Sequence, residues 1–298
     1  MIGRRNLLTT AGTSALVAAL PRQALAANKP WSNDPYTWTD GERVWAVARQ
    51  GGAVTDQKVI WRTRGVLYAF KYPESPIPLV RMQGSEQQWW RPQDDGSFLR
   101  TKSLLTFFAD YETDELLESF TNPITGKTII PRPNFSRVPD GQVLSTQGWS
   151  HNIIRKAFPD YYGKRSIRDI EMNIIRDDLS FHSKVHWPEP LVRRPYNQDN
   201  THFARLSEVM DDEISWVPSH GAGQILMPEM PNVGMDDPDL GQVLWHVEYY
   251  KVRSFDDLPR AYLERAMAEY DNYTVDPIND TGESRLERRL KRAGVWRE

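Results

Sequence analysis

Alternation of apolar and polar residues predicts a body built of β-strands between about Trp31 and Phe255. The predicted strands are residues 58–70, 78–90 with a turn near Gly84, 98–109, 116–120, 128–130, 169–176, 179–187, 202–210, 213–217 and 242–252. Turn-forming residues recur between these runs, at 94–96, 139–141 and 218–223. Short strands separated by Gly, Pro and Asp turns favour an antiparallel barrel or sandwich over β-α-β units.

Two helices are predicted to close the chain. Apolar residues recur at helical spacing from Leu258 to Tyr270, with Asp256 or Asp257 as a cap. Residues 284–293 form a second, strongly basic helix, which we interpret as a solvated helix held by its two leucines. The predicted fold class is therefore mainly β, an antiparallel barrel-like sheet with C-terminal helices.

The N-terminal segment has the features of an export signal. Arg4 and Arg5 precede a short apolar run over residues 9–20, and a small-residue cleavage site follows at 24–26. Paired arginines are typical of twin-arginine (Tat) signals. We therefore expect residues 1–26 to be a signal read by the Tat export machinery, residues 27–298 to form a single β-rich domain, and the mature protein to be periplasmic or secreted. No later stretch is long and apolar enough for stable membrane insertion.

Composition narrows the classes of function. The net charge of −3 argues against a general nucleic-acid binder, and the absence of cysteine excludes disulfides and thiolate nucleophiles. No dinucleotide fingerprint, phosphate-binding loop or nucleophile elbow is present, so no cofactor is predicted. The 11 Trp and 12 Tyr favour an aromatic-lined cavity for a flat small-molecule ligand. The sequence leaves the oligomeric state open.

The segment from Leu104 to Asn134 resembles an uncharacterised bacterial and fungal family, catalogued as a domain of unknown function, many of whose bacterial members carry Tat signals. The turn Asn122-Pro123-Ile124-Thr125-Gly126 matches the family's Asn-Pro-x-Thr-Gly hairpin, whereas residues 110–114 depart from its first turn. The resemblance implies a mostly antiparallel β fold and no established activity. We interpret the Asn122 turn as structural, with Asn capping the backbone and Gly126 supplying a positive φ.

Three predicted strands each carry chemically useful residues on one face. Alternation puts His246, Glu248 and Tyr250 together, His182 and Lys184 together with His186, and Arg62 together with Arg64 and Tyr68. In a barrel with a ligand cavity these faces point inward, and otherwise they are simply solvated. The inward alternative predicts His246 as base, Glu248 as its partner, Tyr250 as proton donor and Arg62 as anion anchor. The predicted ligand-binding residues are His182, Lys184, Tyr68, Trp90 and Trp216.

These residues lead to three functional hypotheses. The first is a cofactor-independent periplasmic enzyme of lyase or isomerase type, acting by acid/base chemistry on a small aromatic or hydroxylated apolar molecule. The second is a non-catalytic periplasmic binding or carrier protein. The third is a metal-dependent enzyme using His246, Glu248 and a histidine from another strand. No metal site is predicted, because His182 and His186 lie about 13 Å apart along a strand and no compact ligand motif is present.

Overall fold

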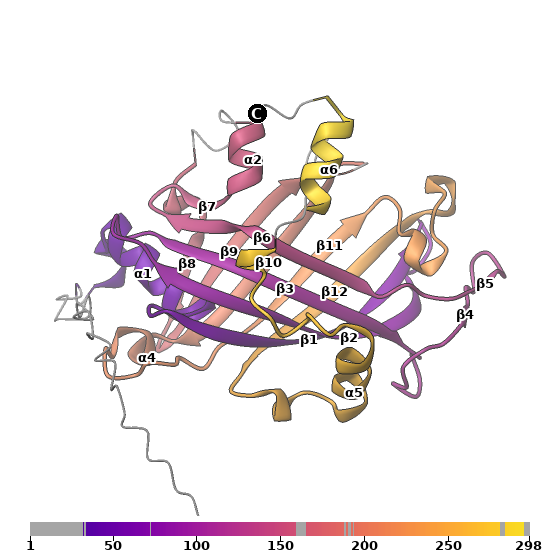
Figure 1. Ribbon diagram of the computed structural model, residues 1–298, viewed down its shortest axis with the longest axis horizontal. Helices are drawn as coiled ribbons and strands as arrows, with labels where there is room; N and C mark the ends of the chain where they lie inside the picture. The colour runs from indigo at the N-terminus through magenta and orange to yellow at the C-terminus, as the bar shows by residue number, and fades with distance from the viewer. Residues whose placement is uncertain are drawn as a thin grey trace, which may run out of the picture. The chain divides into compact units, whose positions relative to one another are not determined.

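The computed structural model describes residue 32 and residues 34–71, 73–158, 165–187, 189, 192, 194–280 and 284–294 (Figure 1). The predicted signal at residues 1–26 lies outside the described residues. From Trp31 onward the chain is one compact unit. Among the helices described, none is long and apolar enough to cross a membrane.

The fold is mainly β, as predicted, and is organised around one ten-stranded antiparallel sheet. Its strand order is β7-β6-β3-β2-β1-β12-β11-β10-β9-β8. These strands are β1 (Gln57–Phe70), β2 (Ile77–Pro92), β3 (Phe98–Ala109), β6 (Asn134–Ser145), β7 (Gly148–His151), β8 (Glu171–Ile175), β9 (Asp178–Trp187), β10 (Tyr196–Arg205), β11 (His220–Met227) and β12 (Gln242–Val252). A separate small hairpin pairs β4 (Phe120–Thr121) with β5 (Thr128–Ile129).

Short helices flank the sheet. The α-helices are α1 (Asp40–Gly51), α2 (Asn152–Ala157), α4 (Leu206–Met210), α5 (Arg260–Glu269) and α6 (Arg285–Arg292). The 3-10 helices are η1 (Pro35–Thr37), η2 (Ile167–Asp169), η3 (Pro231–Val233), η4 (Pro238–Leu240), η5 (Phe255–Asp257) and η6 (Pro277–Asn279). The two predicted C-terminal helices correspond to α5 and α6, although α5 begins after Pro259 without a side-chain cap.

The sheet curls into a half-barrel (Figure 1). Residues of β2, β3 and β6 line the same cavity as residues of β9 and β10, although four strands separate β3 from β10 in the sheet. We call the face toward this cavity the concave face and the opposite one the convex face. Consecutive residues of a strand alternate between the two.

Helices cover parts of both faces. On the concave side, α1 begins with a capping box between Thr39 and Glu42 and packs Val44 and Val47 into a core with Trp61, closing one end of the half-barrel. On the convex side, α5 packs Tyr262 against β2 and β3. The two faces are therefore closed by different segments, and the middle of the concave face is left for a cavity.

Several local predictions are corrected. The β2 ladder runs through Gly84 without a turn, since Gly84 pairs with Thr63 and Thr106 of the flanking strands. A glycine is needed there because a Cβ would lie 2.6 Å from each of the two threonine hydroxyls. Residues 202–210 are the end of β10 followed by α4, and residues 213–217 are not a strand. The segments 139–141 and 218–223, predicted as turns, belong largely to β6 and β11.

The Asn122 turn has the predicted structural role. Asn122 Oδ1 accepts hydrogen bonds from the backbone N–H groups of Ile124 (2.7 Å) and Thr125 (3.2 Å), and Gly126 has a φ of 68°. The Asn122 amide also donates to the carbonyl of Val233 at 2.7 Å, which ties the hairpin to η3.

Candidate functional site

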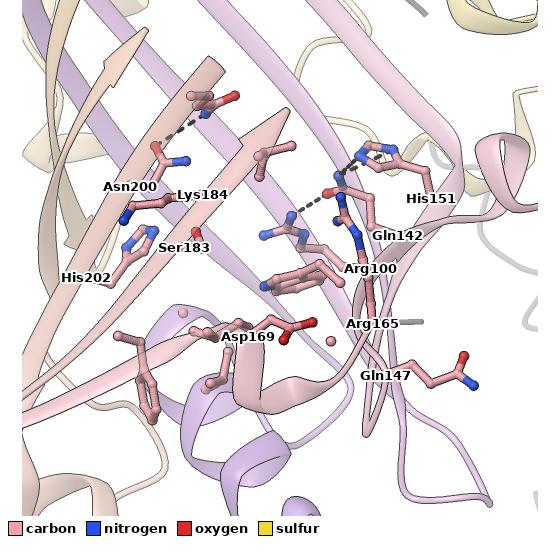
Figure 2. Close-up of a pocket in the computed structure, with 18 of the residues that line it drawn as sticks. Arg100, Gln142, Gln147, His151, Arg165, Asp169, Ser183, Lys184, Asn200 and His202 are labelled. Atoms are coloured by element: carbon pink, nitrogen blue, oxygen red, sulfur yellow. Dashed lines mark hydrogen bonds between the residues drawn. The ribbon is translucent and has the colours of Figure 1, made fainter. Parts of the chain in front are cut away.

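A cavity of about 350 Å³ lies on the concave face. This volume is at the lower end of the range for ligand pockets, so a small molecule fits better than a large cofactor. Figure 2 shows its two facing walls, with Arg100, Gln142 and His151 on one side and Asn200 and His202 on the other. We call the first the β3 wall, formed by β3, β6 and β7, and the second the β10 wall, formed by β9 and β10.

Arg100 is the central cation of the β3 wall. Its guanidinium lies 4.0 Å from the ring centroid of Trp149 and 5.5 Å from that of Trp90, which are favourable cation–π distances. It donates a hydrogen bond to Oε1 of Gln142, its cross-strand neighbour. Burial lowers the pKa of Arg100 to about 10, so the group is still a cation at neutral pH.

Lys102 projects from the same face of β3, two residues along. Its ammonium lies 2.8 Å from Oε2 of Glu86, whose other oxygen accepts from Gln88 at 2.6 Å. Burial lowers the pKa of Lys102, and the nearby Glu86 opposes this shift. The pair is thus mutually neutralising, whereas Arg100 forms no ion pair with any carboxylate of the described residues.

His151 completes a row of cross-strand neighbours that runs from Arg100 through Gln142. The Gln142 amide nitrogen contacts the Nε2 atom of His151. Burial lowers the pKa of His151 to about 3, with further lowering by the positive charges of Lys102 and Arg100. His151 is therefore neutral at physiological pH.

The β10 wall is held by a chain of amides. Asn200 Oδ1 accepts hydrogen bonds from the Tyr249 hydroxyl (3.1 Å) and from the Gln198 amide (3.3 Å). Gly223 on β11 lies beneath this junction, where a Cβ would lie 2.5 Å from Asn200 Oδ1 and 2.8 Å from the Tyr249 oxygen. The glycine is needed there because any side chain would displace the hydrogen-bonded pair.

His202 lines the cavity from β10 and is fixed by aromatic contacts. Its ring stacks on Tyr249 with centroids 5.7 Å apart and meets Trp61 edge-on at 5.3 Å. Burial, followed by the charge of Arg100, lowers the pKa of His202 to about 4. Its Nδ1 atom is buried beside Gly221 without a hydrogen-bond partner, which leaves Nε2 as the nitrogen that can meet a ligand.

The remaining surface of the cavity mixes aromatic and polar groups. Trp149, Phe181 and Trp187 supply aromatic area, and Asp169 of η2 closes one end (Figure 2). Gln50 of α1 donates to the backbone carbonyls of β9 and β10, which attaches the helix to the β10 wall. A planar molecule with a few polar groups fits this lining.

The predicted catalytic residues lie together, but on the convex face. The Tyr250 hydroxyl donates to Glu248 at 2.9 Å, Arg62 pairs with Tyr250 in the β1–β12 register, and His246 shares their face. Tyr250 is 40% exposed, and none of the four side chains lines the cavity. The assumption that the polar faces of these strands point inward is thus not met: Val247 and Tyr249 take the concave positions.

The predicted binding residues are scattered. Lys184 borders the cavity, with its exposed ammonium 3.8 Å from Glu171. Trp90 is buried beneath Arg100. His182 is on the convex face, 2.8 Å from the Thr201 hydroxyl, while Tyr68 is on β1 and Trp216 packs under Arg253 at the end of β12.

Sequence reasoning missed the principal cavity residues, which are Arg100, Lys102, Gln142, His151, Asn200 and His202. A usable signal was present for two of them, because Arg100 and Lys102 alternate with Thr101 and Ser103 inside a strand that was predicted correctly. His202 opens the predicted strand 202–210, whereas Gln142, His151 and Asn200 lie on segments for which no strand was predicted.

Among the described residues no three His, Asp or Glu side chains are grouped so that they could hold a metal ion. Comparison with known proteins found no protein-family model that matches the chain and no matching curated protein.

Proposed function

We propose that the protein is an exported, periplasmic or secreted enzyme of lyase or isomerase type, which binds a small aromatic or hydroxylated molecule in the concave cavity and moves a proton on it. The observation that carries the proposal is the pairing of two walls: a neutral histidine, His202, faces the guanidinium of Arg100 across one small cavity (Figure 2).

His202 acts as the base in this proposal. A pKa of about 4 keeps its imidazole unprotonated at neutral pH. Because this pKa lies well below the operating pH, the imidazole is a weak base, and the reaction depends on stabilisation of the developing negative charge by the opposite wall. The stacked Tyr249 and the edge of Trp61 hold the ring in one orientation, which lowers the entropic cost of reaching the reactive geometry.

The β3 wall supplies the electrostatic part of the reaction. When a proton leaves a carbon beside a carbonyl, negative charge develops on the carbonyl oxygen. Arg100 is a cation fixed in a partly buried wall, where it stabilises such a charge more than in bulk water. Its position is set before the ligand arrives, by Trp149 and Gln142.

A carrier is the second candidate, favoured by the many amide side chains that line the cavity, because amides hold ligands without transferring protons. They are Gln50, Gln88, Gln142, Gln147, Gln198 and Asn200.

The test compares His202→Phe with His246→Phe, which alters a convex-face histidine. Ligands are found by quenching of tryptophan fluorescence, and each is incubated with wild type and variants before mass spectrometry of the products. We expect His202→Phe to lower turnover by about 10²–10⁴ while ligand affinity changes less than about tenfold. We expect His246→Phe to leave both turnover and affinity unchanged. Full turnover in His202→Phe with loss in His246→Phe would return the chemistry to the convex face, and a tight ligand recovered unchanged would favour the carrier.

A further inference from the structure

The charges of the cavity do not cancel at one point on the β3 wall. Lys102 is neutralised by Glu86 at 2.8 Å. Asp169 accepts from the Ser166 backbone at 2.8 Å, as part of the capping box of η2. Arg100 has a half-buried guanidinium with no carboxylate within ion-pair distance among the described residues. Glu86 attracts Arg100 only from beyond ion-pair distance and is shared with Lys102, so two cations share one carboxylate. A partly desolvated cation whose charge is not fully compensated is costly, and a bound anion would reduce that cost.

The guanidinium is also oriented in advance. Trp149 supports it at 4.0 Å and Gln142 accepts one of its hydrogen bonds. One acceptor leaves other N–H groups of its five donors unused. A planar fork held in this way matches the two oxygens of a carboxylate, and little side-chain entropy remains to be lost on binding.

The surroundings favour a flat ligand. Trp149 lies under Arg100, and Phe181 and Trp187 belong to the facing wall. The ring of His202 is itself held edge-on to Trp61, so its plane is fixed. Aromatic and amide surfaces around one cation accommodate a conjugated ring that carries an acidic group.

We propose that Arg100, seated on Trp149, is a carboxylate anchor, and that the natural ligands of the cavity are small planar, conjugated carboxylic acids. This inference rests on the cavity of the proposed function and specifies its substrate class. It assigns anion binding to Arg100 on the concave face, in place of Arg62 on the convex face.

The experiment uses three pairs of probes that share a shape but differ in charge: benzoate with benzamide, cinnamate with cinnamamide, and 2-naphthoate with 2-naphthamide. Dissociation constants are measured at pH 7 by calorimetry for wild type, Arg100→Gln, Arg100→Lys and Arg62→Gln. Circular dichroism and thermal unfolding check that each variant is folded.

We expect at least one acid to bind at least about tenfold more tightly than its amide, because hydrogen bonds between two charged groups are stronger than those between a charged and a neutral group. Arg100→Gln should abolish this preference, Arg100→Lys should restore it in part, and Arg62→Gln should leave it unchanged. If Arg100→Gln does not fold, a reduced preference for acids in Arg100→Lys together with an unchanged preference in Arg62→Gln still identifies Arg100 as the anchor.

Equal affinity for acid and amide, a preference lost with Arg62 instead of Arg100, or no acid binding below about 1 mM would each overturn the anchor. A preference for acids that depends on Arg100 without any turnover would uphold the anchor and contradict the enzymatic part of the proposed function. Turnover of neutral compounds that depends on His202 would uphold the enzymatic part of the proposed function and contradict the anchor.

Discussion

Arg100 sets the tautomer of His151 through a single amide. Arginine can only donate hydrogen bonds, so the Gln142 oxygen must face Arg100, and the Gln142 nitrogen must then donate to Nε2 of His151. Nε2 is therefore unprotonated and the imidazole proton resides on Nδ1. Protonation of Nε2 would turn two donors toward each other, which acts in the same direction as the burial and the positive charges of Lys102 and Arg100 that lower the pKa of His151 to about 3.

This relationship predicts the effect of replacing the amide by a carboxylate. In Gln142→Glu a negative charge lies beside His151, and an opposite charge favours the protonated ring. The pKa of His151 should rise by about two units or more. Histidine side-chain NMR across a pH titration measures it, and an unchanged pKa would show that the amide does not control the ring.

The pH dependence of stability should carry a contribution from His202. Its pKa is about 4 in the folded protein against 6.5 for the free side chain, so the unfolded chain binds the proton more tightly. The free energy of unfolding therefore falls as the pH drops from about 6.5 to 4, by roughly 3 kcal/mol from this group. His202→Phe should show a correspondingly shallower loss in urea unfolding measured at pH 7 and pH 4. Parallel curves for wild type and variant would contradict this.

Tyr262 should anchor α5 to the convex face. Its hydroxyl accepts from the Ser85 backbone N–H at 3.1 Å and donates to the Leu105 carbonyl at 3.0 Å in a fully buried site. Tyr262→Phe leaves both groups unsatisfied and should cost about 1–3 kcal/mol. Tyr250→Phe, at an exposed position, is the matched control and should change stability by less than about 0.5 kcal/mol. Equal effects of the two substitutions in urea unfolding would refute this role for Tyr262.

Export tests the proposed location of the protein. Replacing Arg4 and Arg5 by Lys should leave the precursor in the cytoplasm, because the arginine pair is the feature that the Tat receptor recognises. Cell fractionation followed by immunoblotting measures the distribution. Normal periplasmic accumulation of the variant would rule out this route.

The fold class and the strands with regular alternation could be predicted because local pattern determines them. β1, β3, β9 and β12 follow the alternation closely. α1 was missed although Thr39 and Glu42 form a capping box, since its buried residues surround the helix and leave a weak periodicity. β11 contains Gly221 and Gly223 and resembles a loop, but the glycines serve the close approach of β10 and β12 side chains.

The site was harder to predict because it depends on long-range pairing. Alternation correctly groups His246 with Glu248 and Tyr250, yet it cannot say which face becomes concave. That choice follows from the direction in which ten strands curl, which brings Arg100 on β3 opposite His202 on β10. Glu248 and Tyr250 on the convex face are exposed, whereas Arg100 and His202 on the concave face are desolvated and have lowered pKa values.

The central claim is that the concave cavity between Arg100 and His202 is the functional site. A crystal structure of the protein soaked with cinnamate, at a concentration well above its measured dissociation constant, tests it most directly. The account predicts the carboxylate within hydrogen-bond distance of the Arg100 guanidinium, with the conjugated chain between Trp149 and the β10 wall. Cinnamate bound on the convex face at His246, Glu248 and Tyr250, with the cavity empty, would contradict it.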